Sequence, residues 1–335
     1  MSTALPDQIE IQPIKPFDVR FGPGGASLPG SKSLTNRALL LAALAEGVSR
    51  LEGVLLSDDT QRMIEALRSL GFALEVDEPA RQVEVRGQGG RIPVDEARLE
   101  LGNAGTAMRS LTAACCLGRG RYTLDGVARM RQRPIGELVD ALRQIGGQVL
   151  YLDQIGYPPL QVIGTGQLAG GQLDMAPTLS SQFITALLMA APYCQQGLTI
   201  RFHGPVTSRP YVQMTMALMQ RFGATLETEA ALTRVRVEPG VYRATDYEIE
   251  PDASSASYFL AAAAMTPGSR CVIEGLGRAS LQGDAMFAKV LQQMGAQVML
   301  EDHRVVVHGV GQLRGVDVDL NAMPDMAQTL AAAAV

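Results

Sequence analysis

The chain contains little lysine, histidine or cysteine, and these scarcities limit the kinds of site it can build. Its only lysines are Lys15, Lys32 and Lys289, so arginine carries nearly all of the positive charge. The three histidines form no metal-binding motif, and we expect no metal ion. Four cysteines without a framework spacing predict buried, reduced thiols in a cytosolic protein rather than disulfides.

Two further classes of partner are disfavoured. A net charge of −5 argues against a nucleic-acid surface. The segment Met1–Pro16 has no apolar core of a signal peptide, and the longest apolar runs, Ala38–Ala45 and Leu330–Val335, are too short to span a bilayer. We therefore expect a cytoplasmic protein that binds neither nucleic acid nor membrane. With 335 residues, of which 47% are hydrophobic, two domains are expected.

A repeated pattern organises the chain. A short polar cluster opens an apolar run five times, at intervals of about 70 to 80 residues, which indicates copies of one supersecondary unit. The clusters are Gly30-Ser31-Lys32-Ser33, Gly102-Asn103-Ala104-Gly105-Thr106, Leu179-Ser180-Ser181-Gln182, Asp252-Ala253-Ser254-Ser255 and Met323-Pro324-Asp325-Met326. Four copies are complete, and the fifth stops at Val335 inside its first apolar run.

Each copy predicts the order βαβαββ. In the first copy we expect a helix over Ser31–Ala45, a strand over Ser49–Leu55, a helix over Thr60–Leu70, a hairpin of Phe72–Val76 with Gln82–Arg86, and a strand over Ala97–Leu101. Later helix pairs are expected at 104–117 with 135–145, 181–191 with 210–222, and 254–264 with 283–294. The first helix of each copy is the more apolar, which predicts buried helices surrounded by sheets.

The polar clusters lie where a strand ends and a buried helix begins. The first amide groups of a helix lack internal partners and carry partial positive charge, so several such ends facing one space would bind phosphate. For any single cluster an ordinary helix cap is the simpler explanation. Lys32 and Arg37 favour an anion at the first cluster, because a lysine in a first helical turn and a buried arginine both need a partner.

Three arginines and one aspartate near helix starts can each be explained either by local structure or by a role in binding or catalysis. Arg129, Arg131 and Arg133 precede a helix that Pro134 can start, which suits either a solvated loop or a phosphate or carboxylate site. Asp325 starts a nearly uncharged helix, where it is either an ordinary cap or a general base.

The segment Gly25–Lys32 nearly matches a phosphate-binding loop of nucleotide kinases, but Ser31 separates the glycine from the lysine. A kinase of that type would need Mg²⁺ and nucleotide, and it stays as an alternative.

These motifs together resemble one known family. The segments Leu28–Leu40, Gly102–Arg109 and Arg129–Ile135 look like those of 5-enolpyruvylshikimate-3-phosphate synthases, and Ser180–Phe183, Asp252–Tyr258 and Met323–Asp325 fit as well. The match runs through the whole chain in order. The related UDP-N-acetylglucosamine enolpyruvyl transferases share the fold but differ in the opening motif.

The resemblance implies an α/β fold of two inside-out barrels of repeated βαβαββ units, here with the fifth unit incomplete and the sixth absent. One globule would be 31–250, and the other would combine 1–30 with 251–335. The implied reaction of this shikimate-pathway enzyme transfers the enolpyruvyl group of phosphoenolpyruvate to the 5-hydroxyl of shikimate 3-phosphate, without metal or cofactor. A monomer is expected.

The resemblance also implies roles for individual residues. Asp325 would be the general base, and Lys32 a candidate acid that contacts both substrates. The shikimate 3-phosphate site would comprise Lys32, Ser33, Arg37, Ser180, Ser181, Gln182, Ser208, Tyr211 and Asp325. The phosphoenolpyruvate site would comprise Lys32, Gly105, Arg133 and Gln182.

The chain departs from the family in two respects. Family members continue well beyond the residue matching Asp325 and supply further substrate contacts there, so we expect a C-terminally truncated chain with doubtful activity of its own. A non-catalytic fragment that only binds shikimate 3-phosphate is therefore an alternative. Position 110 is often proline in the family and is Ser110 here, which predicts altered sensitivity to the inhibitor glyphosate.

Overall fold

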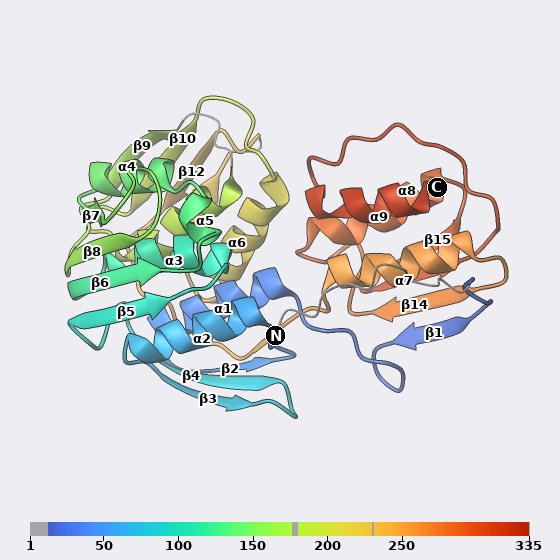
Figure 1. The fold of residues 1–335 in the computed structure, drawn as a ribbon, viewed down its shortest axis with the longest axis horizontal. Coiled ribbons are helices and arrows are strands. Elements are labelled where there is room, and N and C mark those ends of the chain that lie inside the picture. Colours follow the sequence, from blue (N-terminus) through green and yellow to red (C-terminus); the bar gives the residue numbers. More distant parts are fainter. Residues whose placement is uncertain (1–12, 176–179, 230, 335) are drawn as a thin grey trace.

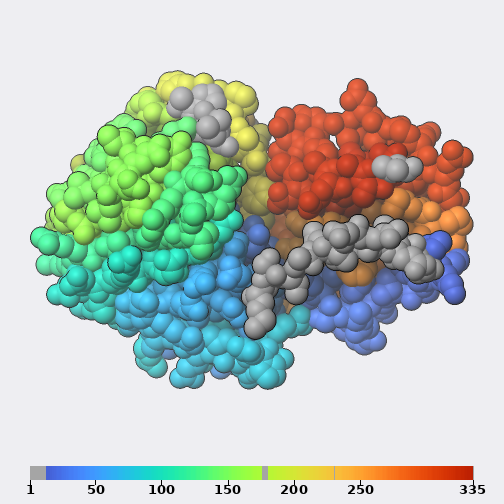
Figure 2. Space-filling model, viewed as in Figure 1, coloured from blue at the N-terminus to red at the C-terminus, as the bar shows by residue number. Residues whose placement is uncertain are grey.

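The protein has two lobes that lie side by side and are joined by two stretches of chain (Figure 1). The computed structural model describes residues 13–175, 180–229 and 231–334. Each lobe has its own hydrophobic cluster. The larger one is drawn from residues between Leu34 and Ile249, and the smaller from Phe21, Leu28 and residues between Ala253 and Ala333. Figure 2 shows the yellow segment of the first lobe facing the red segment of the second across their boundary.

The strands of the described residues form four sheets of the same internal order. In each, an outer strand runs parallel to its neighbour, which pairs antiparallel with one strand of a hairpin. Three sheets belong to the larger lobe: β13 (Tyr247–Glu248), β2 (Glu46–Glu52), β4 (Gln82–Gln88), β3 (Ala73–Asp77); β5 (Glu96–Glu100), β6 (Arg119–Asp125), β8 (Leu160–Thr165), β7 (Gln148–Tyr151); and β9 (Gly171–Met175), β10 (Leu198–Phe202), β12 (Arg234–Val237), β11 (Leu226–Thr228). The fourth contains β1 (Asp18–Phe21), β14 (Arg270–Glu274), β16 (Arg304–His308) and β15 (Gln297–Leu300).

In two of these sheets the outer strand comes from a distant part of the sequence. β13 pairs in parallel with β2, so the end of the third unit completes the sheet of the first. β1 pairs in parallel with β14, with Asp18 opposite Arg270 and Phe21 opposite Ile273. The N-terminal strand therefore lies in the smaller lobe, although the helix that follows it belongs to the larger one.

The helices fill the space inside the sheets. The first helix of each unit in the larger lobe is buried along nearly its whole length: α1 (Lys32–Leu44), α3 (Gly105–Cys115) and α5 (Ser181–Ala190). The second helices bury one face each: α2 (Asp58–Ser69), α4 (Gly136–Gln144) and α6 (Arg209–Arg221). The smaller lobe contains α7 (Ala253–Met265), η3 (Gly283–Met286), α8 (Phe287–Gln293), η4 (Pro324–Met326) and α9 (Ala327–Ala333). Short 3₁₀ turns in the larger lobe are η1 (Met130–Gln132) and η2 (Ala191–Tyr193).

The α/β fold with buried helices, predicted from the repeated pattern, is confirmed. The first strand was expected at Ser49–Leu55, but β2 lies at Glu46–Glu52. At the end of the expected strand, the backbone N–H of Leu55 donates to the Thr35 hydroxyl at 3.1 Å instead of joining the sheet. Within the described part of the chain, every helix falls short of the length and apolarity needed to cross a membrane.

The two connections between the lobes lie against each other. The backbone N–H of Ser31 donates to the carbonyl of Glu250 at 2.9 Å, and that of Asp252 donates to the carbonyl of Pro29 at 2.8 Å. Gly30 faces Pro251 between these two bonds. This short antiparallel pairing places the start of α1 at the boundary between the lobes.

Candidate active site

A cleft of about 540 Å³ lies at this boundary. Its walls come mainly from the N-terminal ends of helices in the larger lobe and from η4 of the smaller lobe. The lining residues are Lys32, Ser33, Arg37, Asp59, Asn103, Gly105, Thr106, Arg133, Ser180, Ser181, Gln182, Ser208, Tyr211, Pro324 and Asp325. Every residue that the resemblance assigns to a substrate site is in this set, so Lys32 and Asp325, which are far apart in the sequence, meet in one cleft.

Helix N-termini converge on the cleft because the first helices of three units start at the same end of the lobe. Some capping occurs: the Ser31 hydroxyl accepts from the backbone N–H of Leu34 at 3.5 Å, and the Ser180 hydroxyl accepts from that of Gln182 at 3.2 Å. Ser180 is thus an ordinary cap as well as a cleft residue, whereas Ser31 caps α1 from outside the cleft lining. The remaining first-turn amides and the helix dipoles favour negative charge in the cleft.

Arg37 supplies a buried positive charge. Its side chain is 3% exposed, and it donates to the Thr215 hydroxyl at 2.7 Å and to the Ser33 carbonyl at 2.9 Å, both of which are neutral acceptors. Burial lowers the pKa of Arg37 to about 10, so the guanidinium is still charged at neutral pH. A buried cation held by neutral acceptors and lining a cleft favours an anionic ligand there.

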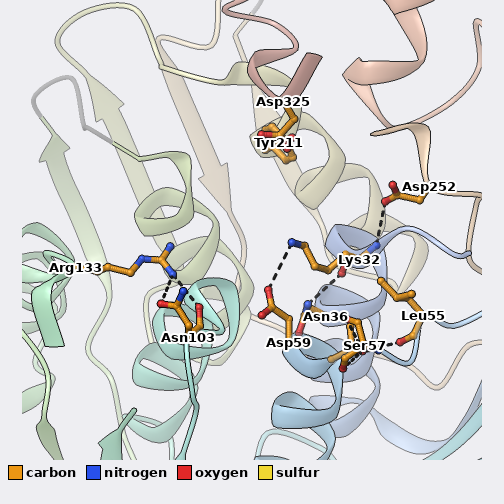
Figure 3. Close-up of polar contacts among 11 residues, drawn as sticks. Lys32, Asn36, Leu55, Ser57, Asp59, Asn103, Arg133, Tyr211, Asp252 and Asp325 are labelled. Atoms are coloured by element: carbon orange, nitrogen blue, oxygen red, sulfur yellow. Dashed lines mark hydrogen bonds and ion pairs between the residues drawn. The ribbon is translucent and has the colours of Figure 1, made fainter. Parts of the chain in front are cut away.

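Lys32 points toward a carboxylate that the sequence reasoning missed. Its ammonium lies 3.6 Å from a carboxylate oxygen of Asp59, at the start of α2, and about half of the lysine side chain is exposed (Figure 3). Asp59 offsets the unfavourable position of a lysine in the first turn of α1. The signal in the sequence is Ser57-Asp58-Asp59, which resembles only a helix cap until the fold places it beside Lys32.

Arg133 lies on the opposite side of the cleft. Its guanidinium donates to the carbonyl of Asn103 at 2.9 Å, and burial lowers its pKa. A Cβ atom at Gly105 would collide with this guanidinium, so a larger residue where α3 begins would displace Arg133 from its present position. Figure 3 shows Arg133 and Lys32 facing the space between them from opposite sides.

The three loop arginines do not act as one group. Arg129 bonds Gln132 at 3.3 Å, whereas Arg131 donates two bonds, of 2.9 and 2.6 Å, to the buried Asp125. Burial by itself would raise the pKa of Asp125, but the hydrogen bonds from Arg131 and Gly126 lower it below its usual value. Arg131 therefore anchors the loop, and of the three it is Arg133 that reaches the cleft.

The other lobe contributes a carboxylate. The Tyr211 hydroxyl donates to a carboxylate oxygen of Asp325 at 2.8 Å, which joins α6 to η4 across the boundary (Figure 3). Burial, together with the charges of Asp284 and Asp325, raises the pKa of Tyr211, so the hydroxyl keeps its proton. The cleft thus combines cations and helix N-termini on one lobe with a carboxylate on the other, which suits anionic substrates and removal of a proton.

Comparison with known proteins agrees with this chemistry. The family described as EPSP synthase (3-phosphoshikimate 1-carboxyvinyltransferase) matches residues 24–335. The chain belongs to the EPSP synthase family. A 3-phosphoshikimate 1-carboxyvinyltransferase from Photobacterium profundum is 45% identical over 98% of this chain and 76% of its own length. The chloroplastic enzyme of Nicotiana tabacum is 45% identical, and the match covers 98% of this chain and 66% of that protein.

A solved EPSP synthase structure, from Acinetobacter baumannii, has the same fold as this member of the family. The superposition gives a TM-score of 0.79 at 25% identity and covers 94% of this chain and 71% of that one. The chain thus spans about three quarters of the bacterial relatives' length and about two thirds of the tobacco enzyme's.

Proposed function

We propose that the cleft between the lobes binds shikimate 3-phosphate and phosphoenolpyruvate, and that the residues named below perform the family's reaction on them. As an EPSP synthase, the chain is a 3-phosphoshikimate 1-carboxyvinyltransferase of aromatic amino-acid biosynthesis. It transfers the enolpyruvyl group of phosphoenolpyruvate to the 5-hydroxyl of shikimate 3-phosphate and releases phosphate. The observation that carries the residue assignment is the buried Arg37 guanidinium, which lines the cleft with neutral partners.

Shikimate 3-phosphate is assigned to the part of the cleft nearest the starts of α1, α5 and α6. Its phosphate and hydroxyls would meet the hydroxyls and amides there, which are strong donors to anions. The assigned residues are Lys32, Ser33, Arg37, Ser180, Ser181, Gln182, Ser208, Tyr211 and Asp325. This site is supported by the grouping of hydroxyl side chains around Arg37.

Phosphoenolpyruvate is assigned to the space between Lys32 and Arg133, next to Gly105 and Gln182. The ammonium and the guanidinium approach this space from opposite sides, which suits a ligand with both a phosphate and a carboxylate. Because Gly105 has no side chain, a ligand can approach the first turn of α3 closely.

The proposed chemistry needs one base and one acid. Asp325 takes the proton of the 5-hydroxyl as that oxygen attacks C2 of phosphoenolpyruvate, and a proton adds to C3, for which Lys32 is the proposed donor. Loss of phosphate from C2 and of a proton from C3 then restores the double bond. Tyr211 holds the Asp325 carboxylate through its 2.8 Å bond.

The two hydrophobic clusters support a division into two domains, 31–250 and 1–30 with 251–335. The proposal further includes a monomer without nucleic-acid partners. A cytoplasmic location is proposed with it, in keeping with four free, buried cysteines.

The test is an assay of phosphate release by this chain with both substrates. We expect turnover that falls by about a hundredfold or more in Asp325→Asn and in Lys32→Met, because each loses a group that acts in the transition state. Asp317→Asn and Lys289→Met are the matched controls, since both residues are exposed and lie outside the cleft lining. Unchanged turnover in either cleft variant would contradict the residue assignment.

The same assay separates the other functions. Calorimetric binding of shikimate 3-phosphate without any turnover would favour a binding fragment over an enzyme. Consumption of UDP-N-acetylglucosamine would favour the UDP-N-acetylglucosamine enolpyruvyl transferase. A requirement for ATP with Mg²⁺ would favour the kinase.

A further inference from the structure

A second, smaller cavity lies beside the cleft, between α6 of the larger lobe and η3 and α7 of the smaller. It has about 10 Å³, which is room for roughly one water molecule. Its lining residues are Ser31, Ser33, Pro210, Tyr211, Met214, Asp252, Ser254, Gln282, Gly283 and Asp284. Tyr211 and Ser33 line both this cavity and the cleft, so the two spaces share a wall.

Asp284 is a buried carboxylate that lines this cavity and lies outside the lining of the cleft. It is 7% exposed, and the Ser254 hydroxyl donates to one of its oxygens at 2.8 Å. The 3₁₀ turn η3, which contains Asp284, is closely packed. A Cβ at the preceding Gly283 would lie 2.6 Å from the Ala322 carbonyl oxygen and 2.7 Å from Pro210. η3 is therefore fixed between α6 and the segment that leads to Asp325.

The charges around Asp284 are mostly negative. The carboxylates of Asp325, on η4, and of Asp252, before α7, both act on it, and Tyr211 faces it from α6. Two cations of the neighbouring cleft are paired with other groups: Arg37 acts on Tyr211, and Lys32 lies beside Asp59. Burial, and then the charges of Asp325 and Asp252, raise the pKa of Asp284 to about 6, although the Ser254 bond lowers it.

We propose that Asp284 is a positioning residue of the transfer reaction, whose negative charge beside Asp325 drives the proton of the substrate hydroxyl onto Asp325. The inference rests on the proposed function, in which Asp325 is the base. Two nearby carboxylates repel each other, and the repulsion disappears when one of them takes up a proton. The proton moves from the hydroxyl oxygen to Asp325, and Asp284 neither gains nor loses one in this step.

The proposal predicts a particular pH dependence. Above about pH 6 Asp284 is ionised and assists, whereas below that pH it is neutral and resembles an asparagine. Asp284→Asn should therefore lower kcat by about three- to tenfold at pH 8, with the KM values little changed. Below pH 5 the two enzymes should turn over at the same rate. A variant that was merely misfolded would instead be slower by one constant factor at every pH.

A measurement without turnover tests the same coupling. Carboxyl-carbon NMR of the aspartate-labelled chain should show one group with a midpoint near pH 6 that is missing in Asp284→Asn. The midpoint should fall in Asp325→Asn, which removes the repelling charge, and rise in Ser254→Ala, which removes the bond to the ionised form. Asp302→Asn is the control, since it lies exposed in the same lobe.

The outcomes separate this inference from the proposed function. Two results would overturn the role of Asp284 even if Asp325 proves essential. One is an NMR titration midpoint of Asp284 that does not move in Asp325→Asn, and the other is a ratio of wild-type to Asp284→Asn turnover that does not depend on pH. Full turnover in Asp325→Asn overturns the proposed function itself. Recovery of the pH 8 rate in Asp284→Glu, which restores the charge, supports the inference.

Discussion

The hydroxyl of Tyr211 donates a 2.8 Å hydrogen bond to Asp325 and so connects the two lobes at the cleft. Tyr211 stands at the first turn of α6 and Asp325 in η4, 114 positions further along the chain. The orientation of the proposed base therefore depends on how the lobes meet.

Tyr211→Phe tests this dependence. Removal of the hydroxyl leaves the carboxylate without its donor, and bonds to charged groups contribute about 1.5 to 3 kcal/mol. We expect kcat to fall by about tenfold or more, while the free energy of unfolding changes little. The exposed Tyr258 supplies the control, Tyr258→Phe. Steady-state kinetics and urea unfolding provide the two measurements, and an unaltered kcat in Tyr211→Phe would contradict the role of the bond.

Arg37→Met should separate stability from binding. Burial lowers the pKa of Arg37 to about 10, so below that pH the folded state bears the cost of a desolvated charge. Replacing the guanidinium by an apolar side chain should raise the free energy of unfolding by about 1 kcal/mol. Calorimetric titration should show that shikimate 3-phosphate no longer binds measurably.

Arg86→Met, at an exposed position on β4, is the control for that experiment and should alter neither quantity. A variant of Arg37 that is less stable and still binds the substrate normally would show that this arginine has a structural role instead.

Asp125→Asn tests how Arg133 is positioned. The buried Asp125 holds Arg131, and the loss of its charge should cost about 2 kcal/mol of stability at pH 7 and raise the KM for phosphoenolpyruvate. Since the pKa of Asp125 is lowered in the folded protein, its contribution is present above pH 3.8 and is lost as the pH falls below that value. Urea unfolding from pH 7 to pH 3 should show wild type and variant converging. Asp140→Asn, on the exposed face of α4, is the control and should not change the urea concentration at the midpoint of unfolding.

Ser110→Pro tests the expected link to glyphosate. Ser110 is 2% exposed inside α3, where proline removes a backbone donor and its ring presses on the carbonyl of Thr106, a cleft residue. We expect a several-fold change in the glyphosate inhibition constant, measured in competition with phosphoenolpyruvate. Ser110→Ala, which keeps the backbone unchanged, should behave as the wild type. If glyphosate inhibited the wild type, Ser110→Pro and Ser110→Ala equally, position 110 would have no effect on glyphosate sensitivity.

The sequence was sufficient to predict the local elements and most of the cleft residues. Apolar periodicity and polar caps depend on neighbours in the chain, so the helices beginning near Lys32, Gly105 and Ser181 could be read directly. The repeat implied that these helix starts are equivalent, and the family motifs indicated which side chains at those starts are proposed to act on substrates.

Contacts between distant segments were decided only by the tertiary structure. No local pattern marks Asp59 or Asp284 as a site residue, yet packing places one beside Lys32 and the other in the wall shared with Tyr211. Likewise the local pattern does not separate Arg131 from Arg133, and it is the buried Asp125 that directs the first away from the cleft. Local patterns report the backbone that a segment prefers, whereas burial and charge pairing depend on which other segments pack against it, and that is set by the whole fold.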